Sequence, residues 1–325
     1  MKEKIFYEIS AINFDDDKII YKNYNSTINK MFQLQSISKF ITSLIVAKLY
    51  ELGKINYETD INKYLKKWKC PIKGITLKHL LSHTSGADES PYNDGELPQK
   101  KMKQTLQLNI DILNGKYINR PFRVIDKIGK KFMYSNPGYQ LIQQIVEEIT
   151  GKPLYKLMEK YIFKPLKMMN STGKLLYDNK HNYNLASYQN LYHMFPDTAA
   201  AGVWSSSGDL LKLGLDLLNG YNKNESKILS QLTIKMIIKP IINLQKNFSW
   251  SMGMMVGKIN GDLHFGHGGS SDLYENIFVI FPEKKKIVII LTHHNPKYYP
   301  NNIISEKEFW NKVSKIIKIK HPYYI

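Results

Sequence analysis

The chain has one cysteine, two arginines and no long apolar run among its 325 residues. Cys70 on its own excludes an internal disulfide. No stretch approaches the ~18 consecutive apolar residues of a transmembrane helix, so we expect no membrane span. The first residues also lack the apolar core of a secretory signal peptide, and by sequence the chain is expected in the cytoplasm.

Positive charge is abundant, but lysine supplies nearly all of it. The 46 basic residues exceed the 28 acidic ones and give a formal net charge of +18, yet only Arg120 and Arg123 are arginines. Proteins that read nucleic acid rely on arginine forks for bases and phosphates. Because the lysines spread over the whole chain, we expect no nucleic-acid partner, and docking on nucleic acid is the weakest alternative. The charge favours attraction of anionic substrates by long-range steering.

The segment Ser36-Ile37-Ser38-Lys39 is the first candidate site, at the start of an apolar helical pattern that ends at Gly53. Residues three apart on a helix lie on one face, so the Lys39 amine is expected beside the Ser36 hydroxyl. A serine becomes a nucleophile only with a nearby base and with donors for the oxyanion. The alternative interpretation of Ser36 is a helix N-cap.

Spacing alone does not identify a site in so lysine-rich a chain. Roughly three Ser-x-x-Lys matches are expected by chance, and two occur, the second at Ser171 and Lys174. That second match contains Gly173 and is typical of a turn. Ser36 instead follows an alternating run at 31–34 and precedes a buried helix, which favours it as the functional serine.

Alternating patterns predict strands near both ends of the chain, with helices between them. Strands are expected around 5–9, 18–22, 30–34, 249–258, 263–265, 274–281 and 287–292, and helical spacing occurs at 140–150 and 305–318. The two sets of strands predict one sheet built from the N- and C-terminal segments. We expect an α+β fold in which residues 1–53 and 200–325 form the domain with the sheet, and residues 54–199 form an inserted, mostly helical domain.

Two further motifs stand far along the chain. Tyr134-Ser135-Asn136 by itself indicates a turn before a helix, and His267-Gly268-Gly269 indicates a glycine-containing strand bend. Together with the first candidate, five segments occur in order: 32–39, 75–86, 134–139, 202–210 and 266–270. In these segments the chain resembles the serine β-lactamase and penicillin-binding-protein superfamily, specifically its class C β-lactamase-like serine hydrolases. The resemblance covers about residues 30–295, most of the chain.

The resemblance implies a fold and a set of catalytic roles. The fold would be an antiparallel sheet flanked by helices, with a mostly helical second domain and the site in the cleft between them. Ser36 would be the acylated nucleophile, and Lys39 and Tyr134 would exchange its proton. The backbone N–H groups of Ser36 and Ser270 would form the oxyanion hole. The residues implied in substrate binding are Asn136, His267, Gly268, Gly269 and Ser270.

Departures from the family pattern bear on the substrate. His267 stands where many β-lactamases have lysine, and Gly268 replaces a common threonine. In the family, that lysine and threonine help to hold a substrate carboxylate. A peptidase, D-aminopeptidase or esterase is therefore favoured over an efficient β-lactamase, with a small-molecule or peptide substrate that carries an ester, amide or lactam carbonyl. The alternative is a non-hydrolytic penicillin-binding sensor or a cell-wall-polymer-binding protein on the same fold.

The remaining histidines carry no chemistry in this interpretation. His83 is expected to stabilise a helix end rather than to act as a base. His264, His293 and His294 lack the spacing of metal ligands with a carboxylate partner, so we expect no metal and no cofactor. Relatives in the family are often exported, which leaves the compartment open.

Overall fold

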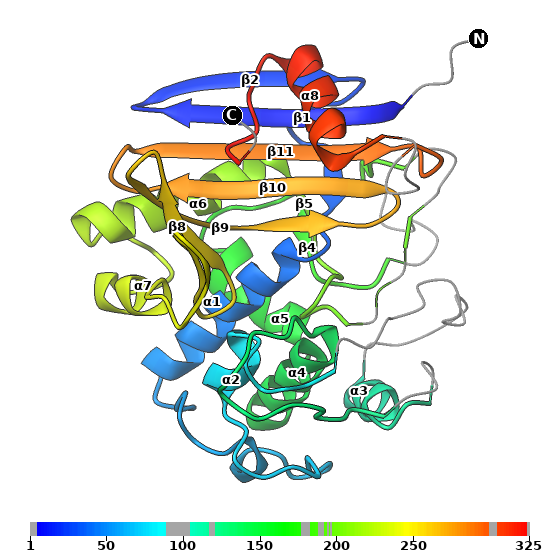
Figure 1. The fold of residues 1–325 in the computed structure, drawn as a ribbon, viewed down its shortest axis with the longest axis vertical. Coiled ribbons are helices and arrows are strands. Elements are labelled where there is room, and N and C mark those ends of the chain that lie inside the picture. Colours follow the sequence, from blue (N-terminus) through cyan, green and yellow to red (C-terminus); the bar gives the residue numbers. More distant parts are fainter. Residues whose placement is uncertain are drawn as a thin grey trace.

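The structure is a computed structural model in which the following parts of the chain are described: residues 5–88, 105–116, 121–176, 183–187, 192–193, 195, 197–298 and 304–323. Figure 1 shows a broad sheet with most of the helices gathered on one side of it. Among the described residues, no helix combines the length and the apolar character that crossing a membrane requires.

The sheet joins the two ends of the chain. Its eight described strands run antiparallel in the order β2-β1-β11-β10-β9-β8-β7-β6. N-terminal β1 pairs with C-terminal β11, from Phe6 opposite His294 to Asp15 opposite Lys286. The predicted antiparallel sheet flanked by helices is confirmed. The strands are β1 (Phe6–Asp15), β2 (Lys18–Tyr24), β6 (Ile242–Gln245), β7 (Phe248–Trp250), β8 (Met255–Ile259), β9 (Asp262–Ser270), β10 (Tyr274–Phe281) and β11 (Lys286–His294).

Two strands of a second, three-stranded sheet are each followed in the chain by a helix. It consists of β3 (Met31–Gln33), β5 (Trp204–Ser206) and β4 (Ser171–Thr172), in the order β3-β5-β4. The sequence indicated a turn at Ser171, but pairing with β5 draws this residue into a short strand. Its hydroxyl hydrogen-bonds to Ser205 Oγ at 2.7 Å and to Asp209 Oδ2 at 2.9 Å, so the Ser171 side chain has a structural role.

Helices cover both faces of the large sheet. The C-terminal helix α8 lies across β1 and β2 (Figure 1), where Phe309 and Trp310 pack with apolar side chains of the sheet's outer face. On the inner face, α1 packs against β9 and α6 against β11. The helices are α1 (Ile37–Glu51), α2 (Leu77–Leu81), α3 (Leu106–Leu113), α4 (Asn136–Thr150), α5 (Leu154–Met158), α6 (Ser207–Lys223), α7 (Gln231–Ile237) and α8 (Glu306–Ile317), with a 3₁₀ turn at Ile61–Lys63 and a π-helical turn at Glu159–Phe163.

Helix α1 runs through the middle of the molecule because it is apolar on nearly all sides. Its Phe40 ring lies 6.5 Å from Phe265 of β9 and 5.3 Å from Phe278 of β10, between ring centroids. One continuous hydrophobic core joins these sheet residues to Leu141 and Ile145 of α4. The division into a sheet domain and an inserted helical domain therefore stays a prediction.

The expected strand at 249–258 is wrong in one respect, because the structure breaks it into β7 and β8. Residues 251–254 between the two strands form a bend. Gly253 adopts φ +84°, and its N–H donates to the carbonyl of Leu81 at 3.1 Å. Local hydrogen bonds between Ser251 and Met254 and between Gly253 and Ser251 close the bend, and the contact with α2, which a local pattern does not contain, anchors it.

Candidate active site

Ser36 lies at the N-terminus of α1, and its hydroxyl does not cap the helix. Gln35, immediately before it, has φ +52°, which turns the chain sharply from β3 into α1. The Ser36 side chain is half-buried, and its Oγ accepts a hydrogen bond from Lys39 Nζ at 3.1 Å. The predicted serine–lysine contact is therefore present in the structure.

The Lys39 amine is fully buried in a largely apolar setting. It donates to Ser36 Oγ and, at 2.9 Å, to the carbonyl of Ala200. It also lies 4.9 Å from the ring centroid of Tyr134 and 5.4 Å from that of Tyr139. Burial lowers the pKa of this amine to about 7, although the charge of Asp197 acts in the opposite direction. A lysine in this state has a substantial neutral fraction at physiological pH.

Tyr134 is held between aromatic neighbours. Its ring stacks on His83 with centroids 4.2 Å apart and meets Trp250 edge-on at 5.8 Å. His83 Nδ1 accepts the backbone N–H of Ser135 at 3.0 Å, and burial keeps the pKa of this histidine well below its usual value. The neutral imidazole thus binds the N-cap residue of α4, a role at a helix end as the sequence analysis expected, and through it supports the segment that carries Tyr134.

Asn136 is the first residue of α4 and is half-buried. The preceding Ser135 caps the helix, because its Oγ accepts the N–H of Gly138 at 3.0 Å. The same hydroxyl donates to the carbonyl of Asp88 at 2.9 Å. The Tyr-x-Asn motif therefore lies at the start of α4, where the Ser135 hydroxyl bonds both to the helix and to the segment that contains Asp88.

Strand β9 contacts the residues that immediately precede Ser36 in the sequence. A Cβ atom added to Gly269 would lie only 2.1 Å from the carbonyl oxygen of Leu34 and 3.1 Å from Cβ of Gln35, so only glycine permits this approach. Asn276 of neighbouring β10 also donates to the carbonyl of Gln33, at 2.9 Å. The distant motifs at 36–39 and 267–270 are therefore brought together.

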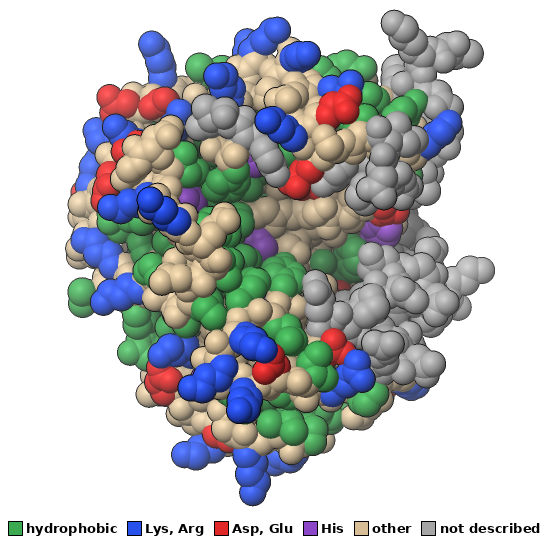
Figure 2. Space-filling view, viewed as in Figure 1, with side chains coloured by type: hydrophobic (Ala, Val, Ile, Leu, Met, Phe, Trp, Pro, Cys, Tyr) green, Lys and Arg blue, Asp and Glu red, His purple; other side chains and the backbone are tan. Residues whose placement is uncertain are grey.

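The end of β9 has a free edge. On one side, residues from Phe265 to Ser270 pair with β10. On the other side, the pairing with β8 stops at Gly266, and no described strand continues it. Gly268 is half-buried and Ser270 is exposed, so this edge is accessible to a ligand. Figure 2 shows this face of the molecule hollowed between the sheet and the helices, with histidine side chains visible inside.

His267 is buried and neutral at physiological pH. Its Nδ1 hydrogen-bonds to the carbonyl of Gly268, and its ring meets Trp250 edge-on at 5.2 Å. Burial, aided by the charge of Lys39, lowers its pKa to about 3. Because the carbonyl requires a proton on Nδ1, Nε2 is an acceptor. This position therefore presents no positive charge to a substrate.

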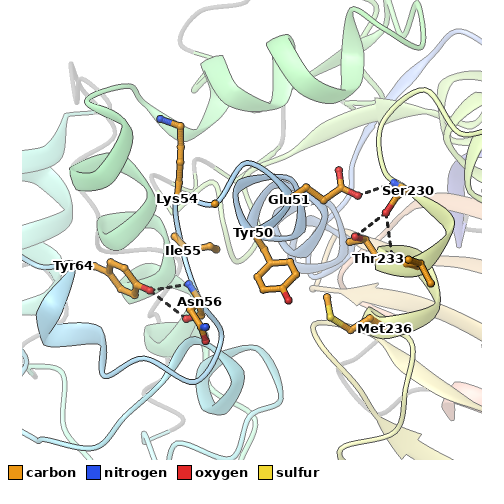
Figure 3. A pocket seen from close by; sticks show the side chains of 11 residues that line it. Tyr50, Glu51, Lys54, Ile55, Asn56, Tyr64, Ser230, Thr233 and Met236 are labelled. Carbon is orange, nitrogen blue, oxygen red and sulfur yellow. Dashed lines mark hydrogen bonds between the residues drawn. The ribbon is translucent and has the colours of Figure 1, made fainter.

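Another hollow, of about 1030 Å³, lies at the opposite end of α1 (Figure 3). Glu51 there accepts the N–H of Ser230 at 2.7 Å, and the Tyr64 hydroxyl bonds to the backbone of Asn56. At 1.5 Å per helical residue, Tyr50 on its wall is about 16 Å from Lys39. None of the predicted site residues lines this hollow. Within the described ranges, no three His, Cys, Asp or Glu side chains could hold a metal ion.

Comparisons with known proteins bear on the family and the fold of the chain. A family model described as Beta-lactamase matches residues 2–305. Protein flp of Staphylococcus aureus (strain MRSA252) is 23% identical over 329 residues, which is 94% of this chain and 62% of that protein. The chain thus spans less than two thirds of the length of this relative. Penicillin-binding protein 4* of Bacillus subtilis (strain 168) is 31% identical over 140 residues, covering 43% of this chain and 30% of that one.

Solved structures show the same fold. The octameric penicillin-binding protein homologue from Pyrococcus abyssi gives a TM-score of 0.73 at 21% identity, covering 96% of this chain and 75% of that one. A D-stereospecific amidohydrolase from Streptomyces sp. gives 0.68 at 19% identity, covering 89% and 90%. At these identities the likeness concerns the fold alone.

Proposed function

The chain belongs to the Beta-lactamase family, and on that premise we propose that it is a serine hydrolase that works through a covalent acyl-enzyme. The contact that carries the proposal is the 3.1 Å hydrogen bond between the Lys39 amine and the Ser36 hydroxyl. The lowered pKa of Lys39, about 7, supports its role as a base near neutral pH. The half-buried position of Ser36 leaves its hydroxyl within reach of a substrate.

In the proposed reaction, Ser36 Oγ attacks the carbonyl carbon of the substrate while Lys39, together with Tyr134, accepts the hydroxyl proton. The proton then passes to the leaving amine or alcohol as its bond to the carbonyl carbon breaks. Water attacks the acyl-enzyme, and the acid product leaves with Ser36 restored. Asn136, at the start of α4, would hydrogen-bond to an amide of the substrate.

The developing oxyanion would be stabilised by the backbone N–H groups of Ser36 and Ser270. Two features support this assignment. The first turn of α1 contains no acidic residue, so the helix dipole favours negative charge there. The free edge of β9 at 267–270 leaves backbone groups open to the cleft, beside the glycines that permit close approach.

The substrate class that we favour is an ester or amide rather than a carboxylate-bearing lactam. His267 is neutral at physiological pH and Gly268 has no side chain, so neither offers a charge or a hydroxyl to a carboxylate. We expect turnover of p-nitrophenyl esters and D-amino-acid amides to exceed that of nitrocefin when kcat/KM values are compared. A nitrocefin rate far above the other two would contradict this ordering.

A non-hydrolytic sensor is the alternative, because the geometry around Ser36 does not report how fast the acyl group is released. The expected result for a hydrolase is an adduct that appears after exposure to a β-lactam and then disappears. Intact-mass spectrometry over time measures this, and digestion should place the added mass on the peptide that contains Ser36. An adduct that persists for hours would favour the sensor.

A further inference from the structure

A buried glutamine outside the sequence motifs reaches the surroundings of Lys39. Gln143 lies two turns after Asn136 in α4 and is only 2% exposed. Its Oε1 accepts the backbone N–H of Ala199 at 3.0 Å. The carbonyl of the next residue, Ala200, is the acceptor for the Lys39 amine. One peptide segment therefore connects the glutamine to the lysine.

The orientation of the Gln143 amide is fixed by its other partners. Its Nε2 donates to Asn109 Oδ1 and to Glu147 Oε1, each at 3.2 Å. Glu147 also accepts the backbone N–H of Leu154, at 2.9 Å. Because these partners require the NH₂ group on their side, Oε1 must face Ala199.

We propose that Gln143 is a positioning residue that holds the Ala199–Ala200 segment so that the Ala200 carbonyl keeps the Lys39 amine on Ser36. This inference rests on the proposed hydrolase function. Helix α1 holds the same segment from its other side, where Thr42 Oγ1 donates to the carbonyl of Ala199 at 3.0 Å. The Ala199–Ala200 segment is thus held by hydrogen bonds from two helices, α1, which follows Ser36, and α4, which starts at Asn136.

The chain offers a matched control for this role. Gln144 lies in the same helix and is fully buried, but its Nε2 donates to Glu148 at 2.5 Å. None of its described hydrogen bonds reaches the segment at 197–203. Gln143→Met and Gln144→Met therefore each remove a side-chain amide from a buried position. Only the first also removes a hydrogen bond to the Ala199–Ala200 segment.

The first experiment compares the rate of acylation by a p-nitrophenyl ester in these two variants. We expect Gln143→Met to acylate about 10- to 100-fold more slowly than the parent protein, because a small displacement of catalytic groups has effects of this size. Gln144→Met should stay within about 2-fold. Similar rates in the two variants at similar unfolding temperatures would overturn the proposal.

Gln143→Glu adds a pH-dependent readout that a general loss of packing would not produce. The introduced carboxyl would still accept from Ala199, but it would face Glu147 on its own helix. The charged groups on the other elements packed around this region are Lys39 of α1 and Asp197, which precedes the Ala199–Ala200 segment. Helices α3 and α5 contribute neutral partners, the amide of Asn109 and the backbone N–H of Leu154.

Burial already raises the pKa of Glu147 to about 7, so below this pH the two carboxyls can share a proton. At each pH the rate of Gln143→Glu is divided by that of the parent protein. We expect this ratio to be near one at pH 6 and to fall toward the ratio of Gln143→Met at pH 8.5. A Gln143→Glu rate at pH 6 as low as that of Gln143→Met would contradict the positioning role.

The outcomes separate this inference from the proposed function. If labelling of the parent protein does not require Ser36, the hydrolase proposal fails. If labelling requires Ser36 but Gln143→Met and Gln144→Met behave alike, only the role of Gln143 fails.

Discussion

Ser36→Ala is expected to abolish covalent labelling by a fluorescent penicillin or a fluorophosphonate and to lower hydrolysis at least about 10³-fold. The substitution removes the attacking oxygen. It does not remove a helix cap, because the Ser36 side chain makes no capping hydrogen bond to α1. The unfolding temperature should therefore change little. Fluorescence of the labelled protein after denaturing electrophoresis, together with a thermal melt, measures both effects.

Ser171→Ala is the matched control, since Ser171 has the same spacing to Lys174 but bonds to Ser205 of the small sheet and to Asp209 of α6. This variant should label as the parent protein does. Undiminished labelling of Ser36→Ala would show that another residue is the nucleophile.

Lys39→Met is expected to lower turnover by about 10³-fold or more, because it removes the base in contact with Ser36 while keeping a long apolar side chain in a buried position. Methionine at this position avoids both the cavity that alanine would leave and the cost of burying an amine. The fold should be retained. Steady-state kinetics and a thermal melt of the variant measure the two expectations.

The pH profile of the parent protein tests the same role. In the proposed mechanism neutral Lys39 is the base, and burial lowers its pKa to about 7, so kcat/KM should fall as pH drops through 7 and reach a plateau above it. Lys39→Met should lose this acid limb. Lys48→Met, in the same helix but paired with Glu51 at 3.1 Å, should keep both rate and profile. A Lys39→Met rate within 10-fold of the parent would leave Tyr134 as the proton acceptor.

Much of the fold follows from local patterns. The apolar periodicity after Ser36 predicts α1, and the strand expected at 274–281 coincides with β10. Helix α4 begins earlier than its periodic part at 140–150, because Ser135 caps it and the helix starts at Asn136, four residues before the expected start at 140. The break between β7 and β8 could not be predicted, since the contact of Gly253 with Leu81 comes from packing against α2.

The site shows the same division between local and distant contacts. Ser36 and Lys39 could be paired from sequence because three residues on a helix define their separation. The contact of Lys39 with Ala200, and the support of Tyr134 by His83, depend on segments that only folding brings together. A signal for Gln143 did exist: polar Gln140, Gln143 and Glu147 recur at helical spacing among the apolar residues of α4.

The pairing of β1 with β11 has a consequence for biosynthesis. A ribosome delivers Ser36 early, but the β9 edge arrives more than two hundred residues later, and β1, which pairs locally with β2, gains β11 as its second partner only when residues 286–294 have emerged. Such distant pairings are slow to form. A nascent polypeptide that stops before β9 therefore lacks the strand that packs against the residues preceding Ser36. In this fold, the site that we propose is completed only after β9 and its neighbour β10 have been synthesised.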